Sequence, residues 1–93
     1  MTVFIDSMNA KYGRMTMCHM ISDADNDDQL HSMASQIGVA RRWHQKAGTP
    51  HSHYDICLSK KKLALELGAV EISRQDLARI LAKKRSLFCD AKP

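Results

Sequence analysis

The feature that most constrains the fold is a change of hydrophobic periodicity at residue 59. Residues 53–58 alternate between polar and apolar side chains, a pattern typical of a strand with one buried face. Ser59 is a residue type that caps helices, and residues 60–67 then carry apolar side chains at helical spacing. These side chains are Leu63, Ala64 and Leu67, which we expect to be buried. Gly68 predicts the end of that helix, because glycine readily adopts the left-handed conformation found there.

The other segments predict further strands and helices in a mixed order. Short β-rich runs predict strands over residues 2–5, 15–21, 39–45 and 69–72. Trp43 is expected to pack inward, and residues 7–14 to form a loop. Apolar spacing predicts helices over residues 27–37 and from Ser73 to Arg85. The order favours a single compact α/β or α+β domain over residues 1–85, with a small mixed sheet of about four to five strands and three helices. Residues 86–93 are expected to form a frayed C-terminal tail.

Length, charge and cysteine content limit the class of protein. The 93 residues suffice for one small domain, and a homodimer interface would add stability. The N-terminus lacks signal-peptide features, and no apolar run reaches the ~18 residues of a transmembrane helix, so no membrane contact is expected. Three cysteines without a Cys-x-x-Cys pair favour a reducing cytoplasm. The net charge of +4 favours a polyanionic partner, although many small domains carry such a charge for solubility alone.

Five polar side chains are candidates for one catalytic cluster, because strand ends and one helix can bring them to a shared edge of the sheet. They are Asp6, His19, His31, His53 and Asp55. A histidine beside a carboxylate suits general acid–base catalysis. We expect no cofactor, but the same set could hold a divalent metal ion for phosphoester hydrolysis. The alternative is a buried hydrogen-bond network that fixes the fold.

Two other metal-site patterns are weaker. Cys18, His19, His53 and Cys57 have zinc-ligand chemistry. However, residues 53 and 57 of a straight strand lie ~13 Å apart and cannot share one ion. The pattern from Val3 to Asn9 resembles the opening of PIN-like metal-dependent ribonucleases, but those folds need more acidic residues and a longer chain.

A second candidate site is a basic surface for nucleic acid or another anion. Its members are Arg14, Arg41, Arg42, Ser59, Lys60 and Lys61. Arginine and lysine bind phosphates, and a helix start at Ser59 would add free backbone N–H donors. Aromatic residues are scarce, so base stacking is a weak expectation. The alternative is an ordinary solvated helix face.

Several short motifs occur in order along almost the whole chain. They are Gly13-Arg14-Met15, Cys18-His19-Met20-Ile21, Leu30-His31, Ile37-Gly38-Val39, Arg41-Arg42-Trp43, His53-Tyr54-Asp55-Ile56 and Gly68-Ala69-Val70-Glu71. In this order they resemble the small phage and bacterial proteins called domain of unknown function 4031. The chain departs from that pattern at Ser7, at His44 and over residues 48–52. The resemblance implies a cytoplasmic, phage- or prophage-borne accessory protein and no established reaction.

Two functions remain open on the sequence. The first is a binding module that acts on nucleic acid or on a host protein, as in host takeover or counter-defence. The alternative is a small hydrolase or nucleotide-handling enzyme that uses the His/Asp cluster for phosphoester chemistry.

Overall fold

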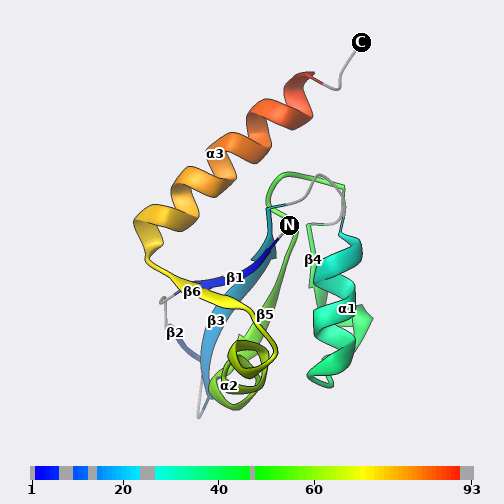
Figure 1. Cartoon of the computed structure of the whole chain (residues 1–93), viewed down its shortest axis with the longest axis vertical. Coiled ribbons are helices and arrows are strands. Elements are labelled where there is room, and N and C mark those ends of the chain that lie inside the picture. The colour runs from blue at the N-terminus through cyan, green and yellow to red at the C-terminus, as the bar shows by residue number, and fades with distance from the viewer. Residues whose placement is uncertain (1, 7–9, 13–14, 24–26, 47, 91–93) are drawn as a thin grey trace.

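The chain folds around one sheet, seen in the computed structural model, which describes residues 2–6, 10–12, 15–23, 27–46 and 48–90 (Figure 1). The strands are β1 (Val3–Asp6), β2 (Ala10–Tyr12), β3 (Met15–Ser22), β4 (His44–Gln45), β5 (His53–Cys57) and β6 (Val70–Ile72). The helices are α1 (Asp28–Gln36), α2 (Leu58–Glu66) and α3 (Arg74–Asp90), with a short 3-10 helix, η1 (Arg41–Trp43).

The sheet is mixed, as the sequence predicts. Five strands run in the order β4-β5-β3-β1-β6, and β2 pairs with the first part of β3. β1 and β6 are parallel, whereas the other pairs are antiparallel. The parallel partner follows from the β5-α2-β6 connection, which carries the chain across the sheet. The predicted α/β fold with three helices is therefore confirmed for the described residues.

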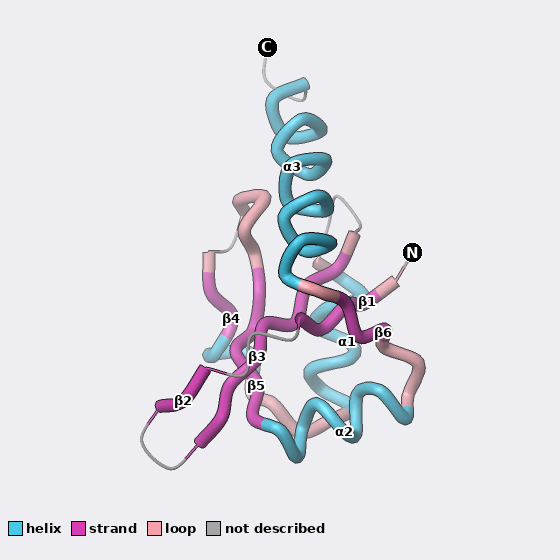
Figure 2. The backbone as a smooth tube through the Cα atoms, turned by 90° about the vertical axis from the view of Figure 1, so that its left-hand side faces the viewer, coloured by secondary structure: helices cyan, strands magenta, loops and turns pink. Residues whose placement is uncertain are grey.

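One face of the sheet forms the hydrophobic core. Its buried strand residues are Val3, Ile5, Cys18, Met20, Tyr54 and Ile56. Helices α1 and α2 cover this face with Leu30, Ala34, Ile37 and Ala64. Because side chains alternate along a strand, the residues between them point to the other face. Helix α3 lies on this second face, so that α3 and α1 are on opposite sides of the sheet (Figure 2).

The segment predicted as a strand over residues 39–45 is mostly not a strand. It forms η1 and only then the two-residue strand β4. The predicted inward packing of Trp43 is wrong, because its side chain is 58% exposed. The core beside β5 is already filled by α1 and α2, and the guanidinium of Arg42 lies 5.2 Å from the centre of the indole instead.

Helix α2 begins earlier and faces differently than predicted. Cys57 occupies the N-cap position without a side-chain cap, so Ser59 lies within the first turn and is not the cap. Leu63 and Leu67 are exposed, whereas Lys61 and Ala64 are buried. Lys61 therefore lies on the inward-facing side of α2, where its ammonium forms an ion pair with Glu71 on β6.

The remaining elements agree with the predictions only in part. The loop expected over residues 7–14 contains β2, which pairs with β3 in a hairpin. Ser73 accepts a hydrogen bond from the backbone N–H of Asp76, as expected at a helix start. Helix α3 continues to Asp90, so the tail expected from residue 86 is helical over most of its length. Among the described helices, none has the length and apolarity to cross a membrane.

Candidate functional site

Four of the five predicted catalytic residues gather on the sheet face that α1 and α2 leave uncovered. Strand pairing places His19 of β3 directly opposite Asp55 of β5, and His53 lies two positions along β5 on the same face. Asp6 ends β1, the other neighbour of β3. Period-two alternation and antiparallel register therefore assemble the group without contributions from a loop.

Asp6 fixes the orientation of His19. The carboxylate is 2% exposed and accepts two hydrogen bonds from that residue, one from the backbone N–H at 2.9 Å and one at Nδ1 at 2.8 Å. The hydrogen bond that His19 donates to Asp6 raises the pKa of His19, burial opposes the rise, and the charges of Asp6 and Asp55 add to it. With the proton held on Nδ1, the Nε2 atom faces Asp55 at 3.5 Å from Oδ1.

His53 is oriented in the same way by a different acceptor. Its Nδ1 lies 2.7 Å from the backbone carbonyl of His51, which can only accept a hydrogen bond. Its Nε2 therefore carries the lone pair and lies 3.4 Å from Oδ1 of Asp55. The rings of His19 and His53 meet edge to face, with centres 5.0 Å apart. Both imidazoles thus direct Nε2 towards one carboxylate oxygen.

That oxygen is the unusual atom of the site. Oδ2 of Asp55 accepts a hydrogen bond from Gln45 at 2.8 Å. Oδ1 is buried and has no hydrogen-bond partner among the described residues. A buried carboxylate oxygen without a partner costs free energy, so its presence calls for a ligand or a proton.

The geometry fits a divalent metal ion. One ligand atom each from His19, His53 and Asp55 lie within 4.8 Å of one another. Ligands about 2.0–2.1 Å from a tetrahedral zinc ion lie about 3.3–3.4 Å apart, which is close to the separations observed here. Asp6 and the His51 carbonyl are then the outer partners that orient metal-binding histidines in proteins.

Open space adjoins the His19–His53–Asp55 triad on two sides. A cavity of about 530 Å³ between this face and α3 is lined by both histidines and by Leu77 and Leu81. A groove of about 660 Å³ lies towards η1, and Asp55 and Gln45 belong to its wall. A metal ion held by the triad would therefore have room for water and substrate.

The fifth predicted residue, His31, does not join this cluster. It lies on α1, on the core side, where its Nδ1 lies 2.7 Å from the hydroxyl of Tyr54. Burial lowers the pKa of His31 and raises that of Tyr54. Its placement in one site with His19 was wrong, because α1 packs on the opposite face of the sheet.

His31 belongs instead to a second polar cluster that the sequence did not reveal. Asp27, His31 and His44 could also offer ligand atoms to one ion. Here, however, Ser52 donates to Asp27 at 2.8 Å and lies 2.5 Å from Nε2 of His44. Each of these polar groups has a hydrogen-bond partner within the cluster, as in a structural network that ties α1 to β4 and β5.

The predicted basic residues divide between surface and core. Arg41 and Arg42 are exposed on η1, and Lys60 lies in the first turn of α2 next to the groove. Lys61 is only 8% exposed and is paired, so its assignment to an anion-binding surface is wrong. Arg14 lies outside the described residues.

Among the described residues, Ser59, Cys18 and Cys57 do not belong to a metal site. The Ser59 hydroxyl lies 3.2 Å from the Cys57 thiol, and this contact lowers the pKa of Cys57. Cys18 is fully buried in the core, on the face opposite His19. The zinc site that combined these two cysteines with His19 and His53 is therefore excluded.

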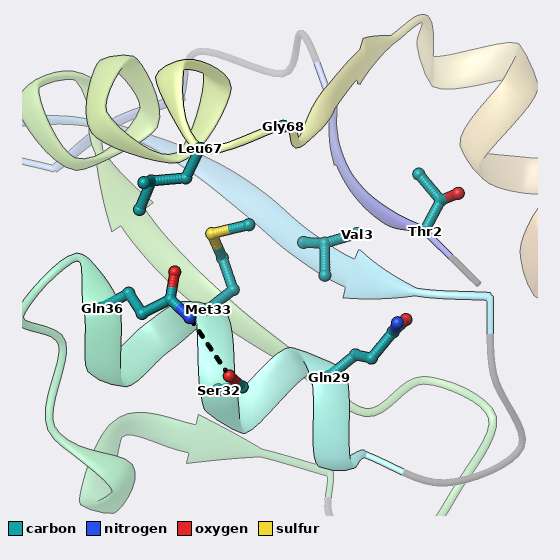
Figure 3. A pocket seen from close by; sticks show the side chains of 8 residues that line it. All are labelled: Thr2, Val3, Gln29, Ser32, Met33, Gln36, Leu67 and Gly68. Atoms are coloured by element: carbon teal, nitrogen blue, oxygen red, sulfur yellow. Dashed lines mark hydrogen bonds between the residues drawn. The ribbon is translucent and has the colours of Figure 1, made fainter.

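A third cavity lies far from this chemistry. It occupies about 280 Å³ between α1, the end of α2 and β1. Figure 3 shows that its walls carry amide, hydroxyl and apolar side chains, among them Gln36, which donates to Ser32 at 3.3 Å. No titratable side chain lines it among the described residues, so it offers no acid, base or metal ligand.

Comparison with known proteins gives a family and no activity. A family model described as protein of unknown function (DUF4031) matches residues 3–84, which confirms the resemblance seen in the motifs. No curated protein and no solved structure matches the chain.

Proposed function

This chain belongs to the DUF4031 family, and we propose that it is a metal-dependent hydrolase of phosphoesters whose metal ion is held by His19, His53 and Asp55. The observation that carries the proposal is the convergence of two oriented imidazole nitrogens on Oδ1 of Asp55, a buried oxygen without a hydrogen-bond partner among the described residues. Three protein ligands beside open space are typical of catalytic zinc sites, which keep a position for water.

That arrangement supports hydrolysis. A zinc ion held by these residues would lower the pKa of bound water to about 7 and would supply hydroxide at neutral pH. In the proposed reaction a water oxygen bonds to phosphorus, the bond from phosphorus to the leaving alcohol breaks, and the water proton ends on the alcohol oxygen. Asp6 and Gln45 act as positioning residues, because each holds one ligand side chain in place.

The charge of the chain supports a phosphoester over a neutral substrate. The formal net charge is +4, and Arg42, Lys46 and Lys60 line the two open spaces beside the triad. Positive charge around a site raises the local concentration of anionic substrates. The expectations of a cytoplasmic location and of a phage or prophage origin stay predictions.

Zinc binding and phosphodiester hydrolysis test the proposal together. Calorimetric titration with zinc should show a single ion per chain, and bis(p-nitrophenyl) phosphate should be hydrolysed with zinc or manganese and not with a chelator. His53→Ala and Asp55→Asn should remove both signals while far-ultraviolet circular dichroism stays native.

The matched control is His31→Ala, which removes an imidazole from the second cluster on the opposite face. It should retain zinc binding at the first site. If His31→Ala loses the ion and His53→Ala keeps it, the metal belongs to the second cluster and the proposal is wrong. If zinc binds as expected but no phosphodiester is hydrolysed, the hydrolase assignment is wrong.

A further inference from the structure

The groove beside the triad contains the chain's single tryptophan in an exposed position. Trp43 is 58% exposed, although tryptophan contributes strongly to packing when buried. The guanidinium of Arg42 lies 5.2 Å from the ring centre, within the range of a cation–π contact, and this contact helps to fix the ring. An exposed, oriented indole in a groove is a stacking platform for another aromatic ring.

The short edge strand explains why this groove exists. β4 pairs only with His53 and Tyr54, so the outer edge of β5 from Asp55 to Cys57 has no strand beside it among the described residues. The chain from Gly38 to Trp43 passes at a distance from that edge and forms the far wall. The space of about 660 Å³ is within the range of small-ligand pockets, about 300–1,000 Å³. It suits a single nucleotide better than a duplex.

The groove is also cationic where a sugar–phosphate backbone would pass. Arg42 and Lys60 line it, and neither forms an ion pair with an acidic side chain among the described residues. Asp55 is the acidic side chain in the wall, and its charge would be offset by a metal ion at the triad. Unpaired cations beside an aromatic platform are the combination that single-stranded nucleic acid recognises.

We propose that the substrate is single-stranded nucleic acid, bound with the base of the nucleotide next to the reacting phosphate stacked on Trp43. The inference rests on the proposed phosphoester hydrolysis for the position of that phosphate. Asp55 connects the proposed metal site to the groove, because it belongs to the ligand set and also lines the groove wall. Duplex is disfavoured, since its bases are already stacked and paired.

Tryptophan fluorescence gives a direct test, because Trp43 is the only tryptophan. A single-stranded thymidine oligonucleotide, added with EDTA so that hydrolysis is prevented, should quench the emission. Affinity should fall as salt rises, because phosphate contacts release counterions. The same sequence annealed to its complement should quench much less.

Variants separate stacking from general attraction. By fluorescence anisotropy of a labelled oligonucleotide, Trp43→Leu should weaken binding about 5- to 150-fold, the effect expected for loss of one stacked base, and Trp43→Phe should restore most of it. Lys60→Gln should weaken binding more than Lys62→Gln, which removes the same charge from an exposed position on the same helix.

The outcomes distinguish this inference from the hydrolase proposal. Quenching without zinc binding would support the groove and overturn the metal site. Zinc-dependent hydrolysis of the small phosphodiester, with no quenching by the oligonucleotide, would overturn the groove and leave the hydrolase standing. Equal binding of single strand and duplex, or equal loss with Lys60→Gln and Lys62→Gln, would reduce the interaction to non-specific charge and also overturn the inference.

Discussion

Replacing Asp6 by asparagine should weaken zinc binding without removing a ligand. The asparagine oxygen can still accept the backbone N–H of His19, but its amide then presents donors to Nδ1. While the asparagine oxygen accepts from the backbone N–H, the imidazole can accept from the amide at Nδ1 by moving its proton to Nε2, the atom proposed to bind the metal. The substitution therefore acts through the tautomer of His19.

The size of the effect follows from the hydrogen bond that is lost. A hydrogen bond to a charged group contributes about 1.5–3 kcal/mol, equivalent to a change of about 10- to 150-fold in affinity. Loss of an outer-shell partner of a metal ligand costs a similar 10- to 100-fold. Competition for zinc with a chromogenic chelator, measured at constant ionic strength, has the range to detect such a change.

The pH dependence identifies the cause. The pKa of His19 is raised above 6.5, chiefly by the hydrogen bond that its ring donates to Asp6. Protonated His19 therefore stabilises the folded chain below pH 6.5, and that contribution is lost as the pH rises through the raised pKa. Zinc needs the neutral imidazole, so zinc affinity changes in the opposite direction and falls as the pH drops below the raised pKa. In Asp6→Asn this acid limb should move to lower pH.

A matched control uses the same substitution at an exposed carboxylate. Asp76→Asn, on the first turn of α3, should leave both the zinc affinity and the acid limb unchanged. Thermal melts would establish that each variant is folded at the temperature of the titration. If Asp6→Asn binds zinc with wild-type affinity and an unshifted acid limb, Asp6 does not orient a metal ligand, and the account given for His19 is wrong.

Three further predictions concern stability, each measured by urea denaturation. Leu30→Ala should cost about 2–5 kcal/mol because Leu30 is fully buried, whereas Leu63→Ala, at an exposed position, should stay within about 0.5 kcal/mol. Glu71→Gln should cost about 1 kcal/mol, a value discounted because Glu71 is half exposed, whereas Lys61→Met should be neutral or stabilising. Gly38→Ala should cost about 1–2 kcal/mol because Gly38 has a φ of +82°.

The local sequence pattern predicted much of the fold, but only part of the arrangement of the His19–His53–Asp55 site. The alternation over residues 53–58 places His53 and Asp55 on one face because the strand period is two. The pairing of Asp6 with His19 depends on the β1–β3 register, which no local signal reveals. His31 was misplaced because the sequence does not say which face of the sheet a helix covers.

The errors at Lys61 and Trp43 have a common origin. Trp43 was expected to face inward because its segment was predicted to be an alternating strand, and Lys61 was expected at the surface because of its charge. Lys61 is buried because an acceptor, Glu71, arrives from a strand that follows in the chain. Trp43 is exposed because the core volume near it is already occupied, and its contact with Arg42 is a surface contact. Tertiary context decided both cases.

The two histidine clusters of this fold provide an internal comparison. They use the same residue types, and β5 contributes to both, with Tyr54 on one face and His53 and Asp55 on the other. In the second cluster the serine and tyrosine hydroxyls bind the carboxylate and the imidazoles.

At the triad, the hydrogen bonds fix Nδ1 of each ring and leave both Nε2 atoms facing Oδ1 of Asp55, which has no hydrogen-bond partner in the part of the chain that the structure describes. A network built only for stability would place a donor at that oxygen, since an unpaired buried acceptor costs about 1–3 kcal/mol. The absence of a hydrogen bond to this oxygen among the described residues, together with two Nε2 atoms directed at it, is the reason to assign this face of the sheet to a cation.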